Sequence, residues 1–213
     1  RNLDGFFGGG VQVTSNAPAF SVRSISPARG SLLGDNEAVI TGSGFRPGGG
    51  SQTDLKVQFL RPVAGGDPVV LPVTEILLAE STQVRFKVPD SGLRRTGILS
   101  TPVDVEVTLG SSRRTLARAY AYEYPRVLSA NLASVRSGGG ELLILTGTGF
   151  APSSTAAFLV DGAVTRVSAQ VTKVEADGTK HFLVTPDLRG SEGKKATVEV
   201  TVPGVDTFPL PGK

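Results

Sequence analysis

The side chains that most often perform chemistry in proteins are scarce in this sequence and form no recognisable constellation. Cysteine is absent, which excludes disulfides, thiol nucleophiles and cysteine metal sites. The single histidine, His181, has no second histidine with which to hold a metal ion or act as a base. A G-x-S-x-G elbow is also absent, and Gly42-Ser43-Gly44 is better explained as a turn. We therefore expect a non-catalytic protein without cofactor, in which His181 is a structural or surface residue.

The acidic residues are dispersed and occupy positions typical of turns and strands. Asp161 and Asp177 each precede a glycine, a pair that signals a tight turn more often than a ligand. Asp90 and Asp187 follow matching prolines, so calcium at an edge between two domains is an alternative. Calcium takes about six to eight oxygen ligands, and no D-x-[DN]-x-[DN]-G run supplies them. The sequence therefore predicts no metal site.

The aromatic residues are the strongest candidates for a binding surface. Tyr120, Tyr122 and Tyr124 are the only tyrosines, and they alternate along one predicted strand. They either pack inside the protein across a seam between domains, or form a strip that docks a protein or stacks on a sugar. Phe6 and Phe7 stand beside a glycine-rich run, which is typical of an anchor to another surface. The chain has no tryptophan, the residue that sugar-binding strips commonly use.

The elements that must position these residues are β-strands. The 27 glycines and 14 prolines punctuate short runs rich in valine, threonine and phenylalanine. Alternation with a period of two is plain at residues 55–59, 83–88, 103–107 and 197–202. No long window shows a helical period. The sequence therefore predicts an all-β protein.

The chain repeats itself over most of its length. Residues 22–45 and 127–150 are blocks of equal length, and later landmarks such as Phe59 and Phe158 recur in the same order. The two blocks end in Gly42-Ser43-Gly44-Phe45 and in Gly147-Thr148-Gly149-Phe150. Glycines there permit a turn or a close approach of the backbone, and each phenylalanine is expected to plug a core. Two copies of one unit are predicted.

The order of these landmarks resembles the IPT/TIG domain. A strand leads into TGSGF or TGTGF, then a strand ending in phenylalanine, a strand closing in VP or TP, a D-V-E-V-T strand, and finally A-Y-A-Y-E-Y-P. The resemblance implies two tandem immunoglobulin-like β-sandwiches: residues 21–125 and 126–213, after an extended arm at residues 1–20. The copies meet at Tyr124-Pro125-Arg126 almost without a linker, which favours a semi-rigid rod.

The N-terminal arm carries a possible connection to another molecule. Gly8-Gly9-Gly10 reads as a tether, and the alternating run that follows, with Val11 and Val13, reads as a short strand. The second copy ends in the proline-rich residues 206–211, so its sheet is expected to expose an edge. Residues 11–14 or 19–22 could supply a strand to that edge in a neighbouring copy, which would build a head-to-tail filament.

These observations favour a structural protein over an enzyme. The IPT/TIG resemblance implies a secreted, bacterial cell-surface or extracellular protein, adhesive or structural, which acts as a spacer and docks protein partners. One alternative is a filament or virion subunit assembled through its arm; another is a carbohydrate-binding accessory module of a polysaccharide enzyme, with a glycan as partner. The net charge of +3 is dispersed, so no nucleic acid is expected. No apolar run is long enough to span a membrane.

Overall fold

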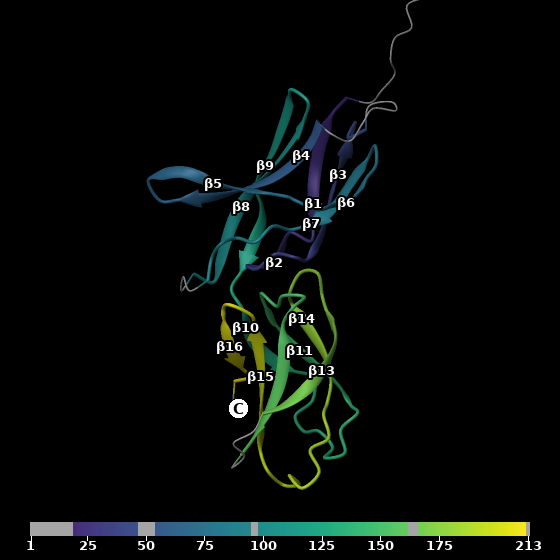
Figure 1. Cartoon of the computed structure of the whole chain (residues 1–213), viewed down its shortest axis with the longest axis vertical. Helices are drawn as coiled ribbons and strands as arrows, with labels where there is room; N and C mark the ends of the chain where they lie inside the picture. The colour runs from purple at the N-terminus through teal and green to yellow at the C-terminus, as the bar shows by residue number, and fades with distance from the viewer. Residues whose placement is uncertain (1–18, 47–53, 95–97, 162–165, 212–213) are drawn as a thin grey trace, which may run out of the picture.

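The fold is built from β-strands arranged as two sandwiches stacked end to end (Figure 1). The computed structural model describes residues 19–46, 54–94, 98–161 and 166–211. Strands β1 to β16 lie within them, and the all-β sandwich fold predicted from the sequence is confirmed. The predictions for Phe6, Phe7, Val11 and Val13 lie outside the described residues.

The N-terminal sandwich, residues 19–123, has two sheets. One has the order β1 (Ser21–Ser26), β3 (Glu37–Ser43), β7 (Gln83–Lys87) and β6 (Ile76–Ala79). The other has the order β2 (Arg29–Ser31), β9 (Ser112–Glu123), β8 (Ser100–Leu109), β4 (Leu55–Val63) and β5 (Gly66–Pro72). All pairs are antiparallel except β2 with β9, which are parallel. The predicted alternating runs fall on β4, β7 and β8, whose inward residues Phe59, Phe86 and Val105 are fully buried.

The C-terminal sandwich, residues 126–211, contains the remaining strands. Their order is β10 (Arg126–Ala130), β11 (Leu142–Thr148), β14 (Lys180–Val184), β13 (Arg166–Val174), β12 (Thr155–Val160), β15 (Ala196–Val202) and β16 (Asp206–Pro209). The ladder folds over at β13, because residues 166–169 pair with β12 and residues 170–174 pair with β14. A single strand therefore belongs to both layers. In the N-terminal sandwich the same role is divided between β5 and β6.

The internal repeat is preserved in fine detail. The β1–β3 ladder shifts register between Val22 and Ser24, and the β10–β11 ladder shifts between Val127 and Ser129. Both glycine-rich turns end in a buried phenylalanine, since Phe45 and Phe150 are 2% and 1% exposed. The predicted role of these two side chains as core plugs is confirmed.

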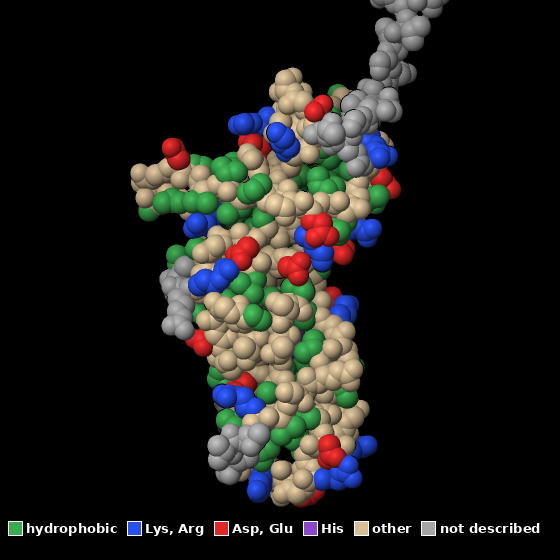
Figure 2. All heavy atoms as spheres, viewed as in Figure 1, with side chains coloured by type: hydrophobic (Ala, Val, Ile, Leu, Met, Phe, Trp, Pro, Cys, Tyr) green, Lys and Arg blue, Asp and Glu red, His purple; other side chains and the backbone are tan. Residues whose placement is uncertain are grey.

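The β4–β5 hairpin extends beyond the body of the N-terminal sandwich as a two-stranded ribbon (Figure 1). Leu71 is half-buried, and the other residues of β5 are exposed. The strand therefore faces solvent on both sides. Val63, Val69 and Val70 are 43%, 37% and 51% exposed. Apolar side chains line this projection in the space-filling view (Figure 2). The ribbon therefore presents apolar side chains that do not pack into the core of the sandwich.

Candidate functional site

The tyrosine strip predicted as a docking surface is divided between a core and a seam. Tyr120 and Tyr122 are 0% and 1% exposed and pack with Phe59, at ring-centroid distances of 5.2 and 6.1 Å. The docking prediction is wrong for these two residues, because the face of β9 that carries them is the inner face. Burial raises the pKa of both phenol groups above its ordinary value. Each hydroxyl is satisfied within the protein: Tyr120 donates to Asn36 Oδ1 (3.2 Å) and Tyr122 to the Pro89 carbonyl (2.8 Å).

Tyr124 lies where the two sandwiches meet. Its ring stands edge-on to Phe208 of β16, with ring centroids 5.6 Å apart and planes at 89°. Its carbonyl accepts a hydrogen bond from Thr148 Oγ1 (2.9 Å), and its N–H donates to the Leu99 carbonyl (2.8 Å). Aromatic pairs of this geometry contribute roughly 0.5–1.5 kcal/mol beyond the area they bury. The residue therefore connects β16 and β11 to the end of the N-terminal sandwich.

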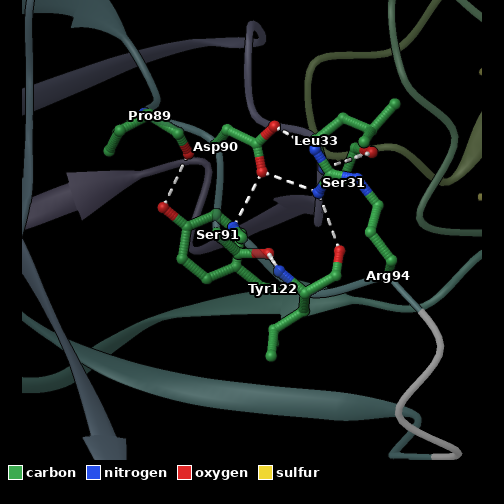
Figure 3. Close-up of polar contacts among 9 residues, drawn as sticks. Ser31, Leu33, Pro89, Asp90, Ser91, Arg94 and Tyr122 are labelled. Atoms are coloured by element: carbon green, nitrogen blue, oxygen red, sulfur yellow. Dashed lines mark hydrogen bonds and ion pairs between the residues drawn. The ribbon is translucent and has the colours of Figure 1, made fainter. Parts of the chain in front are cut away.

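The loop that follows Pro89 is held together by polar contacts of its own residues (Figure 3). The Asp90 carboxylate accepts two hydrogen bonds from the Arg94 guanidinium, at 2.9 and 2.6 Å, and one from the Gly92 N–H at 2.8 Å. Burial alone would raise the pKa of Asp90, but the bonds from Arg94 and Gly92 outweigh it and hold that pKa below its usual value. The ion pair between Asp90 and Arg94 and the bond from Gly92 therefore stabilise the conformation of this loop.

Arg94 also reaches the C-terminal sandwich. A side-chain carbon built on Gly204, in the β15–β16 turn, would lie 3.8 Å from Arg94 Nε. Gly149 makes a second close approach, because its added carbon would meet the Glu123 carbonyl oxygen and lie 2.7 Å from Pro125 N. We define the seam as Arg94, Tyr124, Gly149, Gly204 and Phe208. These contacts join the end of the N-terminal sandwich to β11, to β16 and to the β15–β16 turn.

The aspartate that corresponds to Asp90 in the second copy is also engaged by arginine. Asp187 forms an ion pair with Arg189, and accepts the Arg189 N–H at 3.0 Å. The side-chain bond from Arg189 lowers the pKa of Asp187 to about 2. Among the described residues, no group of three His, Asp or Glu side chains could hold a metal ion. Both aspartates therefore act as loop-shaping acceptors.

His181 lies in the core of the C-terminal sandwich. It is fully buried on β14, with its ring centroid 5.5 Å from that of Phe150. Nε2 lies 3.3 Å from the Ser154 carbonyl, whereas Nδ1 has no partner among the described residues. Burial lowers the pKa of His181, although the contact with Ser154 opposes that shift. The structural interpretation of this histidine fits its position.

This burial makes the stability of the C-terminal sandwich dependent on pH. The unfolded chain protonates His181 near pH 6.5, whereas the folded chain does so only at lower pH. The contribution of His181 to stability is therefore constant above about pH 6.5 and is lost as the pH falls toward the folded pKa. We expect the melting temperature to fall between about pH 7 and pH 5, and to fall less steeply in His181→Gln. Parallel melting curves for the two proteins across this range would contradict the assignment.

A groove of about 750 Å3 opens on the flank of the C-terminal sandwich, where β13 leaves β12 to join β14. The partly or fully buried apolar residues in its wall are Ala156, Ala157, Ala169, Val171 and Val174. Exposed polar residues complete the wall, and these are Ser153, Thr155, Arg166, Ser168, Thr172, Lys173 and Thr201. The groove thus combines an apolar floor with a polar rim.

The two cations of the groove already have partners. Arg166 Nε lies 2.6 Å from Glu199 Oε2, and Lys173 Nζ lies 3.0 Å from Glu175 Oε1. None of the described residues that line the groove is aromatic. These features disfavour both an anionic ligand and a stacked sugar. The groove was not predicted from the sequence. The only signal for it is that residues 166–174 contain no proline, whereas β5, the corresponding strand of the first copy, contains two prolines.

The comparisons with known proteins give only distant structural matches. No family profile and no curated protein matches the chain. Among solved structures, the plexin A4 extracellular region matches 89% of this chain with 14% identity and a TM-score of 0.43. The chain covers only 18% of that region. A fragment of S. aureus TarS matches 94% of the chain with 10% identity and a TM-score of 0.43, and 66% of the fragment is covered. At these values neither likeness bears on function.

Proposed function

We propose that this chain is a non-catalytic structural module of the cell surface or extracellular space, in which two β-sandwiches act as a semi-rigid spacer and present protein-docking surfaces. The observation that carries the proposal is the seam. Tyr124, Gly149 and Arg94 bring the two sandwiches into contact around a junction that has no free linker. A spacer needs this property, because a flexible junction would not hold docking surfaces at a fixed distance.

Two surfaces supply the docking part of the proposal. The β4–β5 ribbon presents Val63, Val69 and Val70 to solvent, away from the core of its own sandwich. The groove on the C-terminal sandwich offers an apolar floor within a polar rim. Exposed apolar surface of this kind commonly marks sites of protein association. None of the described residues forms a helix long and apolar enough to cross a bilayer.

The spacer role is tested by the distance between the two sandwiches. The chain has no cysteine, so two introduced cysteines are the only sites that a spin label can react with. Ser112 and Lys195 are both exposed, and we choose Ser112→Cys and Lys195→Cys. We expect a narrow distance distribution by electron paramagnetic resonance. Insertion of Gly-Ser-Gly-Ser between Pro125 and Arg126 should at least double its width, because the inserted residues uncouple the seam.

A matched insertion controls for the general effect of added residues. The same four residues inserted after Gly65 fall in the exposed turn of the β4–β5 ribbon, far from the junction. This variant should keep the narrow distribution. A wild-type distribution as broad as that of the junction variant would overturn the spacer proposal.

A filament or virion subunit is the second candidate function. The observation that favours it is the open side of β13 in the groove, which no described strand covers. A sheet edge of that kind accepts an added strand from another chain.

A further inference from the structure

We propose that the groove between β12 and β13 receives residues 11–14 of a second copy of this chain as an added β-strand. The inference rests on the docking function proposed above and names the partner of one docking surface. It is carried by a comparison of three exposed sheet edges, by the side chains of the groove, and by the reach of the arm.

The edge expected from the sequence, at residues 206–211, is closed to strand addition. Residues 206–209 do form a closing strand, β16, which pairs with β15. Leu210 donates its N–H to the Val198 carbonyl at 2.8 Å, so by alternation Thr207 and Pro209 direct their backbone groups outward. Pro209 has no N–H, and the Thr207 N–H already donates to Asp206 Oδ1 at 2.8 Å. The outer edge of β16 therefore has no donor to offer at these two positions.

The edge of β5 is blunted in the same way. Val73 donates its N–H to the Val57 carbonyl at 2.9 Å, so the outward positions of β5 are Pro68, Val70 and Pro72. Two of these three residues cannot donate a hydrogen bond. Proline at outward positions is a common protection of edge strands against pairing with other chains. The ribbon is thus suited to contacts through side chains rather than through its backbone.

The second half of β13 lacks this protection. Residues 166–174 include no proline, and residues 170–174 are paired only on the β14 side within the part of the chain that the structure describes. Glu175 donates its N–H to the Lys180 carbonyl at 3.0 Å, so Val174 directs its N–H and carbonyl away from β14. Val174 also belongs to the wall of the groove. An incoming strand would find an open backbone there.

The side chains of the arm match the groove. Residues 11–14 alternate Val-Gln-Val-Thr, so a strand of this sequence presents both valines on one face. Valines suit the floor formed by Ala156, Ala169 and Val171, and the glutamine and threonine suit the hydroxyl-rich rim. In strand addition, main-chain hydrogen bonds supply affinity and pockets for alternate side chains supply specificity. The N-terminal arm therefore has the chemistry that the groove requires.

The arm cannot reach the groove of its own chain. Strand β1 begins at the end of the N-terminal sandwich remote from the seam and runs toward β2, which lies beside the junction (Figure 1). The six residues of β1 span about 20 Å. The stretch from Thr14 to Ala19 spans at most about 17 Å when fully extended. Because the groove lies beyond the seam, its occupant must come from another copy.

This geometry makes the contact heterologous. The arm leaves one end of the molecule, and the groove lies on the sandwich at the other end. A contact between unlike surfaces repeats from copy to copy and builds either a ring or an open filament. Each added copy would present a fresh groove to the next arm.

Cysteine cross-linking tests this contact directly, since the chain has no native thiol. We expect Gln12→Cys chains mixed with Ser168→Cys chains to form a disulfide-linked dimer under mild oxidation, because both side chains face the polar rim in this arrangement. Ser168 is exposed in the rim of the groove. Ser112→Cys, an exposed serine at the start of β9 in the N-terminal sandwich, is the matched control and should form at least tenfold less dimer. Equal yields with the two partners would overturn the inference.

A chain with both cysteines distinguishes the two routes of addition. Gln12→Cys combined with Ser168→Cys should give a ladder of linked multimers. An internally linked monomer as the only product would show addition within one chain and would also overturn the inference.

Sedimentation supplies a readout without cross-linking. The full chain should associate with increasing concentration, and Ser168→Glu should weaken that association at least tenfold while Ser112→Glu leaves it unchanged. Val11→Asp with Val13→Asp, which alters only the arm, should abolish it. A full chain that stays monomeric at high concentration would reject the arm contact but leave the spacer proposal intact, because that proposal depends on the seam distances.

Discussion

Gly147→Ala is expected to lower the free energy of unfolding of the C-terminal sandwich by about 3 kcal/mol or more. An added side-chain carbon would clash with the Arg126 carbonyl oxygen and lie 2.6 Å from Phe150 Cζ. The carbonyl belongs to the first residue of β10, and the ring is 1% exposed in the core. Neither can move without opening the β10–β11 ladder or the packing beneath it.

The repeat predicts the same cost in the first copy. A carbon added to Gly42 would clash with the Ser21 carbonyl oxygen and lie 2.7 Å from Phe45 Cζ. Tyr120 and Tyr122 are both buried in the N-terminal sandwich, so tyrosine fluorescence reports mainly on that half. In urea, Gly42→Ala should shift the tyrosine transition to lower concentration. Gly147→Ala should shift the far-ultraviolet circular dichroism signal and leave the tyrosine transition nearly in place.

Gly138→Ala is the matched control for the C-terminal sandwich. A carbon added there has no heavy atom within 4 Å, and its backbone is not in the left-handed region. Its effect should stay within about 0.5 kcal/mol. Equal urea midpoints for Gly138→Ala and Gly147→Ala would show that the close approach at Gly147 is relieved at no cost.

Local pattern was sufficient to predict most strands and the two phenylalanine plugs. Residues 55–59 and 197–202 alternate strictly, and in both runs the apolar positions face the core. The Gly-x-Gly-Phe turns were predictable because the first glycine, Gly42 or Gly147, recurs in both copies where the neighbouring backbone leaves no room for a side chain. Repetition at fixed spacing therefore conveyed tertiary information that a single copy does not contain.

The fate of the tyrosines could not be predicted in the same way. Alternation places Tyr120, Tyr122 and Tyr124 on one face of a strand, but it does not say which face is inside. The structure places the first two under Phe59, and carries the third past the end of the sheet to Phe208. Whether a face is buried depends on the opposite sheet, which is distant in sequence.

The groove was unpredictable for a related reason. It exists because β13 changes partner between Ala169 and Gln170, from β12 to β14. Both partners are antiparallel neighbours, so residues 166–174 carry the same strand pattern whether or not they cross between layers. Only the pairing itself reveals that half of one edge is left open.

Tyr120→Ala is expected to lower the free energy of unfolding of the N-terminal sandwich by about 3–5 kcal/mol, as for other large aromatic truncations in cores. The ring contacts Phe59 and Tyr122, each with a centroid distance of 5.2 Å, and no part of it is exposed. Tyr120→Phe keeps these contacts and loses the 3.2 Å bond to Asn36 Oδ1, so it should lose only about 1 kcal/mol. Urea unfolding followed by circular dichroism measures both losses of stability.

The docking interpretation predicts a different result. If the Tyr120 ring lay on the surface, Tyr120→Ala would fold as stably as wild type and would fail only to bind a partner. A Tyr120→Ala protein with an unchanged urea midpoint would therefore restore the tyrosine strip as a surface and contradict the buried cluster.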